Sequence, residues 1–326
     1  MQQDNNVKQK QINELGILFI IVVLATLVTA ILSNILATKN IQMPAILGIV
    51  LGEGVIMIPG LIYIVYKKYS FVEQLGFRKI KVSTFFMTVL IAFLTMPIAS
   101  FINVLTQFFV KNTLVQASGS LTSNSSSVVL LIAGIVGPIC EELIFRGLYF
   151  ERIKAVSRPF IAALLSAVFF GLMHLNVNQT CYAFVLGLIF AIVNQASGSV
   201  YTSIIVHIVV NTVNVLMLLV ANAAYDNMGV DMAEAVEDVR TSSMIYYTAA
   251  VYMVLAIICV AILVPCIAAI AKFQGRTDEL KLMFKRAEKS ESEDVKVFAN
   301  IPVIVGIVLC VAIIFGLDPL IRMMGM

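Results

Sequence analysis

Long apolar runs separated by short polar stretches dominate the chain. Nine runs are rich in Leu, Ile, Val, Phe and Ala, and most approach the roughly 20 residues that a membrane-crossing helix needs. The fifth and sixth runs are shorter, so we expect their helices to be tilted, re-entrant or sheltered by neighbouring helices. The predicted spans cover approximately residues 15–38, 43–66, 82–108, 127–150, 159–175, 181–196, 200–221, 244–271 and 300–320.

The composition supports the same class of protein. Of the 326 residues, 60% are hydrophobic and 13% are charged, whereas soluble proteins are roughly half apolar and a quarter charged. The sequence therefore predicts an all-α polytopic membrane protein with about eight to nine transmembrane helices in a lipid bilayer. The net charge is only +3, which gives no electrostatic reason to expect nucleic acid as a partner.

The loops predict an orientation. If the N-terminus is cytoplasmic, most of the 22 Lys and Arg residues fall in cytoplasmic segments, as the positive-inside rule requires. We therefore expect a multi-pass protein of the cell membrane, with a cytoplasmic N-terminus and the C-terminus outside. The compact chain is typical of a bacterial plasma-membrane protein. The five cysteines lie in apolar runs without a CxxC pair, so we interpret them as small packing residues.

Residues 138–147, PICEELIFRG, place three charges inside the fourth predicted span. Insertion scales assign about 2.5 to 3.5 kcal/mol to a charge at mid-span. Glu142 and Arg146 are four residues apart in the favourable order for a helical ion pair. Glu141 points about 100° away, without a partner in its own helix, and is a candidate general base or acid. The alternative is a charge cluster that only orders helix packing.

Both histidines of the chain also lie in apolar segments. A single histidine there is usually a packing hydrogen-bonder, but the placement of both favours a site. If the fourth and fifth spans form a hairpin turning near residues 155–158, Glu141 and His174 meet at the same depth and could activate a water. His207 and Asn211 are four residues apart on one helix face, so we expect two donors aimed at one point, where an oxyanion could form.

Three motifs in this region resemble the CPBP family, the intramembrane proteases that process CAAX-prenylated proteins and bacteriocins. The family has two glutamates and an arginine, then Phe-x-x-x-His, then His-x-x-x-Asn or Asp. Here these are EELIFR (141–146), FGLMH (170–174) and HIVVN (207–211), intact and in order. VEQLGFRK (72–79) also looks like the segment that precedes the family's core. The resemblance covers about 127–220, under a third of the chain.

The resemblance implies an all-helical fold with a water-accessible cavity and a glutamate-dependent peptidase. It implies Glu141 as the general base, His174 as its water-holding partner, and His207 with Asn211 as the oxyanion site. We expect Glu142, Arg146 and Phe170 to support this site structurally. The expected partner is a membrane-associated peptide or protein substrate, processed as a bacteriocin-type peptide or a CAAX-like tail, without a cofactor or a metal.

This interpretation divides the chain into four parts. The acidic outer segment 222–243 and the Ser-rich loop near 112–126 are interpreted as solvated connectors. The mixed-charge segment 273–299 is interpreted as a solvated cytoplasmic helix that also acts as a connector. The predicted parts are a cytoplasmic tail (1–14), N-terminal transmembrane helices and loops (15–126), a CPBP-type catalytic core (127–221), and a C-terminal loop with transmembrane helices (222–326).

Three alternatives stay open on the sequence. A zinc protease could use the two histidines and a glutamate, although HExxH is absent. A non-catalytic protein could use the same pocket to bind a peptide, act as a scaffold or confer bacteriocin immunity. A transporter would rely on Glu53 in the second span, which we otherwise interpret as a residue that lines a cavity or pairs with Arg146.

Overall fold

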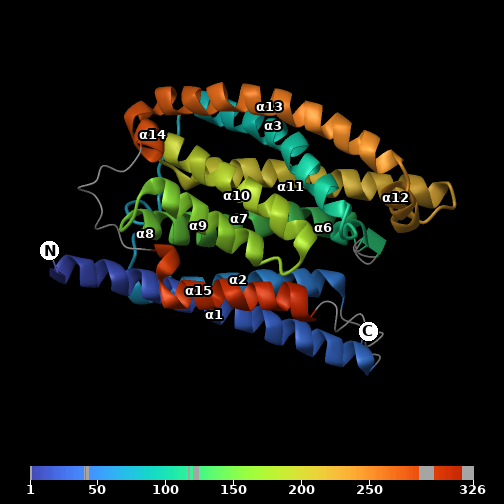
Figure 1. The fold of residues 1–326 in the computed structure, drawn as a ribbon, viewed down its shortest axis with the longest axis horizontal. Coiled ribbons are helices and arrows are strands. Elements are labelled where there is room, and N and C mark those ends of the chain that lie inside the picture. The colour runs from blue at the N-terminus through green and yellow to red at the C-terminus, as the bar shows by residue number, and fades with distance from the viewer. Residues whose placement is uncertain are drawn as a thin grey trace.

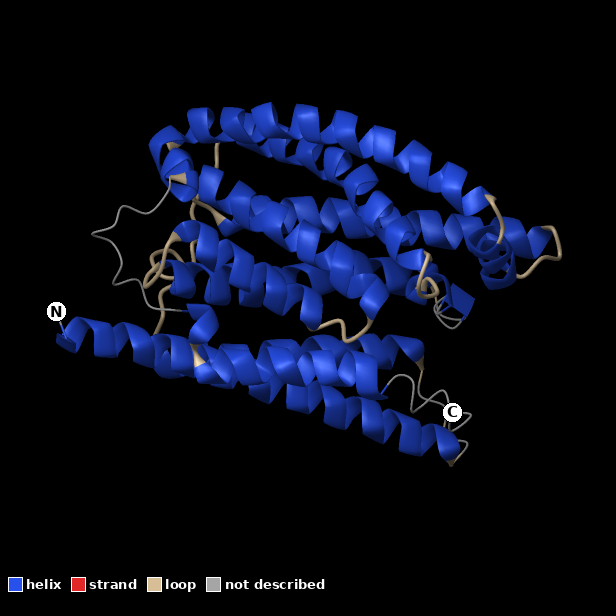
Figure 2. Cartoon of the chain, in the orientation of Figure 1, coloured by secondary structure: helices blue, strands red, loops and turns tan. Residues whose placement is uncertain are grey.

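The computed structural model describes residues 2–39, 41, 44–116, 118–119, 125–285 and 297–317. All regular structure in these ranges is helical (Figures 1 and 2). Seven helices are long and apolar enough to cross a membrane, and two apolar helices are shorter. The long helices are α1 (Gln2–Thr38), α2 (Ala45–Lys67), α3 (Val82–Gln107), the composite helix Ser126–Lys154, α10 (Val177–Ser197), α11 (Val200–Asn227) and α13 (Met244–Gln274).

Every predicted span thus corresponds to a helix, with two differences in length. The fifth, α9 (Pro159–Leu172), is short as expected. The sixth is longer than expected, because Asn176 caps α10 and starts it at Val177. The ninth is the short α15 (Ile301–Ala312) followed by the π-helical η5 (Ile313–Leu317). The last three residues of its predicted span, 318–320, lie outside the described residues.

The helices lie roughly along one direction in three layers (Figure 1). The helices α3 and α13 form one outer layer, and α1, α2 and α15 form the other. Between them lie α9, α10, α11 and the composite helix. The N-terminus and the last described residues are at opposite ends of the bundle, as expected for an odd number of spans.

Two apolar clusters fix the middle layer from both sides. On one side Phe19 of α1 stacks on Phe169 of α9 with ring centroids 3.9 Å apart. On the other, Ile91 of α3 and Ile270 of α13 pack with Phe190 of α10 in a cluster of fully buried side chains. Because both outer layers contact the middle helices, the polar residues of that layer are held in a closely packed setting.

The composite helix is not a regular α-helix. Its parts are α6 (Ser126–Leu131), η1 (Ile132–Val136), α7 (Gly137–Glu142), η2 (Leu143–Phe150) and α8 (Glu151–Lys154), and both η segments are π-helical. The amide of Gly137 donates to the carbonyl of Ile132, five residues back. Proline has no amide hydrogen and crowds the preceding turn, so Pro138 explains the widened turn before it.

The N-terminal tail, the acidic segment and the Ser-rich loop contain helices that the sequence did not predict, whereas a helix was expected in the mixed-charge segment. Helix α1 begins at Gln2, within the predicted tail. The acidic segment contains α12 (Met232–Thr241), and the mixed-charge segment contains α14 (Thr277–Phe284) and the short η4 (Val297–Ala299). The Ser-rich loop contains α4 (Thr113–Gln116). Residues 117, 120–124 and 286–296 of these segments lie outside the described residues.

Candidate active site

The predicted ion pair is present at the centre of the composite helix. Nη1 of Arg146 lies 2.7 Å from Oε1 of Glu142, and both side chains are completely buried. The same carboxylate oxygen lies 3.0 Å from Nδ1 of His207 on α11. One oxygen of Glu142 therefore links the composite helix to α11. The ion pair with Arg146 also compensates two charges that would otherwise be isolated at mid-span.

Aromatic rings surround the rest of the Arg146 guanidinium. Its Cζ lies 4.3 Å from the ring centroid of Phe170 and 5.1 Å from that of Phe190. Nε and Nη2 have no hydrogen-bond partner among the described residues, so these π faces supply part of the missing stabilisation. Gly187 of α10 makes room for the group, because a Cβ there would lie 2.8 Å from Nη2.

Glu141 differs from its neighbour in exposure. Its side chain is 14% exposed, whereas that of Glu142 is fully buried. Oε2 of Glu141 lies 3.4 Å from Nε2 of His207. Its partner is therefore on α11, and among the described residues no ion pair joins Glu141 to its own helix. Of the two adjacent carboxylates, Glu141 is therefore the more accessible.

His207 lies between the two glutamates and contacts each with a different ring nitrogen. Nδ1 faces the carboxylate that Arg146 holds, so a proton on Nδ1 is favoured. The 3.4 Å contact from Nε2 to Glu141 then requires one further proton, either on the carboxyl group or on the ring. One proton consequently lies between Glu141 and Nε2 of His207 and can be held by either group. Such an arrangement suits a site that transfers protons.

His174 lies in the turn after α9 rather than on a helix. Its Nδ1 is 3.0 Å from the carbonyl oxygen of Phe170. Because a carbonyl only accepts, Nδ1 carries the hydrogen and the neutral ring keeps a free lone pair on Nε2. The Phe170 ring stands edge-on to His174 at 5.4 Å and to His207 at 5.7 Å, and so separates the two histidines.

The expected contact between Glu141 and His174 is absent from the described structure. The hairpin does turn at residues 155–158, since α8 ends at Lys154 and α9 begins at Pro159. However, the prediction that Glu141 and His174 lie at the same depth assumed a regular helical rise per residue. The π-helical segment η2 changes both the rise and the direction of the chain. In this structure Glu141 contacts His207 instead.

The expected donor pair also has another arrangement. Nδ2 of Asn211 donates to the carbonyl of Ala133 at 3.3 Å, and His207 contacts the two glutamates. The donors therefore do not converge on an open point here. Asn211 and its neighbour Thr212, which donates to the Gly134 carbonyl, instead bind carbonyls in the widened turn of η1.

Glu53 on α2 lies near the same site without an ion-pair partner in the described structure. Its Oε2 is buried and makes no hydrogen bond. Its Oε1 lies 2.9 Å from the position that a Cβ on Gly137 would occupy. Gly137 is one helical turn before Glu141, and the two carboxyl groups interact electrostatically. The expected pairing with Arg146 is therefore wrong, and no pattern in the sequence indicated that Glu53 lies close to Gly137.

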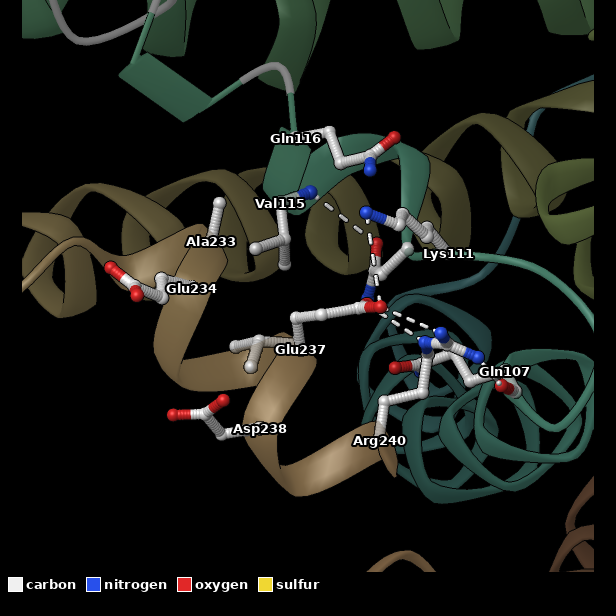
Figure 3. A pocket seen from close by; sticks show the side chains of 11 residues that line it. Gln107, Lys111, Val115, Gln116, Ala233, Glu234, Glu237, Asp238 and Arg240 are labelled. Atoms are coloured by element: carbon white, nitrogen blue, oxygen red, sulfur yellow. Dashed lines mark hydrogen bonds and ion pairs between the residues drawn. The ribbon is translucent and has the colours of Figure 1, made fainter. Parts of the chain in front are cut away.

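The structure also has a cavity of about 300 Å³ away from these residues, between α4, α12 and the end of α3 (Figure 3). Three of its charged side chains are paired with one another. Arg240 donates to both carboxylate oxygens of Glu237, at 2.7 and 2.6 Å, and Lys111 lies 3.8 Å from the same group. The hydrogen bonds from Arg240 hold the pKa of Glu237 below its ordinary value. This cavity shares no residue with the cluster around Glu141.

A metal site is not evident in the described ranges. They contain no group of three or more His, Cys, Asp and Glu side chains arranged to hold a metal ion. The interactions of Glu141, Glu142 and His207 are hydrogen bonds and ion pairs with one another.

Comparison with known proteins is informative for this region. Residues 123–213 match the family described as type II CAAX prenyl endopeptidase Rce1-like. This segment is therefore similar to that family, and it includes the three motifs that resemble the CPBP family. The matched range contains all seven residues singled out from the three motifs, from Glu141 to Asn211.

A curated relative also matches part of the chain. It is the protein named "Putative membrane peptidase YdiL" of Bacillus subtilis (strain 168), 32% identical over 92 residues. The alignment covers 28% of this chain and 38% of the relative. No solved structure matches the chain.

Proposed function

We propose that this protein is an intramembrane endopeptidase that hydrolyses a peptide bond with a water activated by Glu141 and His174. The observation that carries the proposal is the contrast between adjacent glutamates. Glu141 is partly exposed beside His207, whereas Glu142 is fully buried in an ion pair. The similarity of residues 123–213 to the Rce1-like family and the peptidase relative support the same reaction class.

The first step is attack by water. Glu141 takes a proton from the water while Nε2 of His174 accepts a hydrogen bond from its other hydrogen. The water oxygen bonds to the carbonyl carbon, whose oxygen becomes negative. The C–N bond then breaks, and the proton held by Glu141 passes to the leaving nitrogen, so that one water and one peptide bond give a carboxyl and an amino group.

The oxyanion is stabilised by His207 and Asn211. For this role Glu141 turns from His207 toward the water, which releases Nε2 of His207 as a donor. Asn211, one helical turn further along α11, turns from the Ala133 carbonyl to supply a second donor. Two such donors provide a large share of catalysis in acyl-transfer enzymes.

Glu142 and Arg146 support the reaction through His207. The carboxylate beside Nδ1 orients the ring and stabilises its protonated form, as the third member of a catalytic triad does. Arg146 keeps Glu142 ionised within the apolar bundle, and Phe170 packs against the guanidinium and both histidines.

The substrate class follows from the membrane setting and the family. We propose a membrane-associated peptide or protein, processed in bacteriocin-type maturation or as a CAAX-like tail. The protein acts in the plasma membrane with a cytoplasmic N-terminus and needs neither metal nor other cofactor.

The test is comparative peptidomics of cells that make equal amounts of wild-type protein and of Glu141→Gln. Peptides that disappear in the variant, together with longer precursors that accumulate, are the expected result. Identical profiles would overturn the protease function. A binding, scaffold or immunity role would largely survive the same substitution, so the cellular phenotype separates the two classes.

A further inference from the structure

The turn that carries His174 has an unusual backbone. Leu175 has φ of 51°, in the left-handed region that a leucine rarely adopts. Such a conformation persists only where surrounding interactions fix it, and it is found preferentially at functional sites. The question is which interactions fix this turn.

Backbone hydrogen bonds from the His174 and Leu175 amides hold the turn from within, and the side chain of Asn176 ties it to other elements. Its Nδ2 donates to the carbonyl oxygen of His174 at 2.8 Å and to Oε1 of Gln179 at 2.7 Å. Its Oδ1 accepts from the backbone amide of Gln179 at 2.8 Å, which caps α10, and from Oγ1 of Thr113 at 3.2 Å. One amide group thus joins the His174 turn to the start of α10 and to α4.

A neighbouring amide belongs to the same polar cluster but has different partners. Nδ2 of Asn178 donates to Asn103 at 2.6 Å and to Thr106 at 2.8 Å, and its Oδ1 accepts from the Thr113 amide at 3.3 Å. It makes no hydrogen bond to His174 in the described structure. Asn178 therefore provides a matched comparison within one buried network.

We propose that Asn176 is a positioning residue for His174, and that Thr113 of α4 affects the orientation of His174 through its hydrogen bond to Asn176. This inference rests on the proposed function, in which Nε2 of His174 holds the water. The Nδ2 hydrogen bond fixes the His174 carbonyl, the Phe170 carbonyl fixes its ring, and together they set the direction of Nε2. A displacement of about 1 Å in such a group lowers turnover strongly.

Asn176→Ser is the decisive variant, because a serine still caps α10 but cannot donate to both His174 and Gln179. Asn178→Ser is the control, and Thr113→Val removes only the hydroxyl donor at almost constant shape. The chain has two histidines, so reaction of the purified full chain with diethyl pyrocarbonate reports on each by mass spectrometry.

We expect Asn176→Ser to raise the modification rate at His174 several-fold and to leave His207, which is 3% exposed, at the wild-type rate. Turnover of the peptide that accumulates in Glu141→Gln cells should fall roughly tenfold in kcat, with KM within about twofold. Thr113→Val should shift both readouts in the same direction by less, and Asn178→Ser should change neither.

An unchanged or lower modification rate at His174 in folded Asn176→Ser would overturn the positioning role, as would an equal rise in Asn178→Ser. Failure of the proposed function looks different. In that case the wild-type protein and Glu141→Gln give the same peptides, while the His174 modification rate still separates Asn176→Ser from Asn178→Ser.

Discussion

His207 and Glu142 are 65 residues apart in the chain, and Nδ1 of the histidine lies 3.0 Å from Oε1 of the glutamate. This contact couples the buried ion pair on the composite helix to the ring that touches Glu141. A substitution of Glu142 or Arg146 should therefore alter the position of the His207 ring and, through it, the surroundings of Glu141. The two adjacent glutamates should also respond differently to the same substitution.

Glu141→Gln should abolish peptide turnover and leave the fold intact, because the side chain is partly exposed and is not the carboxylate that contacts the buried Arg146. Glu142→Gln should lower the stability by about 3 kcal/mol, since it leaves the buried Arg146 uncompensated. Cleavage and thermal unfolding of both purified variants provide the measurements. Similar behaviour of the two variants in both measurements would show that the division of roles is wrong.

The losses of stability caused by substituting Glu142 and Arg146 should be strongly non-additive. Arg146→Met alone leaves Glu142 charged and buried, and we expect a loss of about 3 kcal/mol in stability. The double variant Glu142→Gln, Arg146→Met buries no charge at this position and should be less destabilised than the sum of the single changes. Unfolding of all four proteins under the same conditions measures this coupling. Additive losses would argue against an energetically important pair.

Gly187→Ala should destabilise the protein by about 1–3 kcal/mol. The added Cβ would lie 2.8 Å from Nη2 of Arg146 and 3.0 Å from Cδ1 of Phe170. Gly52→Ala in α2 is the matched control, because nothing lies within 4 Å of its Cβ position. Alanine also favours a helix over glycine, so the control should equal or exceed the wild-type stability. Equal melting temperatures for the two variants would contradict the close packing around Arg146.

Glu53→Gln tests the transporter alternative. A peptidase reconstituted in liposomes should show no proton flux that depends on this carboxyl group, and the variant should remain folded because Oε2 has no partner to lose. Proton flux is followed with a pH-sensitive dye inside the vesicles, beside a cleavage assay. Flux that Glu53→Gln abolishes, without peptide cleavage by the wild-type protein, would favour transport.

Removal of metal ions should leave cleavage unchanged. The proposed chemistry uses Glu141 and His174 directly, so a protein stripped with a chelator should retain its wild-type rate. The comparison is the cleavage rate before chelation, after chelation and after addition of zinc. Loss on chelation followed by recovery with zinc would replace the glutamate mechanism with a metal-dependent one.

The sequence was sufficient for features that depend on one segment. Apolar run length predicted the positions of the helices, and the four-residue spacing predicted the pair of Glu142 and Arg146. The hairpin turn at 155–158 was also predicted, because charged residues and Pro159 interrupt the apolar pattern there.

Features that depend on two segments were harder to predict. The choice of His207 over His174 as the neighbour of Glu141 depends on the direction of each side chain after the widened turns. The position of Glu53 beside Gly137 depends on which face of α2 meets α7, and α2 is apolar on all sides, so its pattern marks no face. The sequence also gave no reason to expect a left-handed Leu175.

The two π-helical stretches have a consequence for protein engineering. A regular α-helix advances by about 100° per residue, whereas the wider turns on both sides of Gly137–Glu142 rotate this short segment relative to its flanks. If residues 138–147 were grafted onto an ideal helix, the grafted protein would have the same amino acids pointing in other directions. A successful transplant would need to include the complete stretch from Ile132 to Phe150, with its irregular backbone.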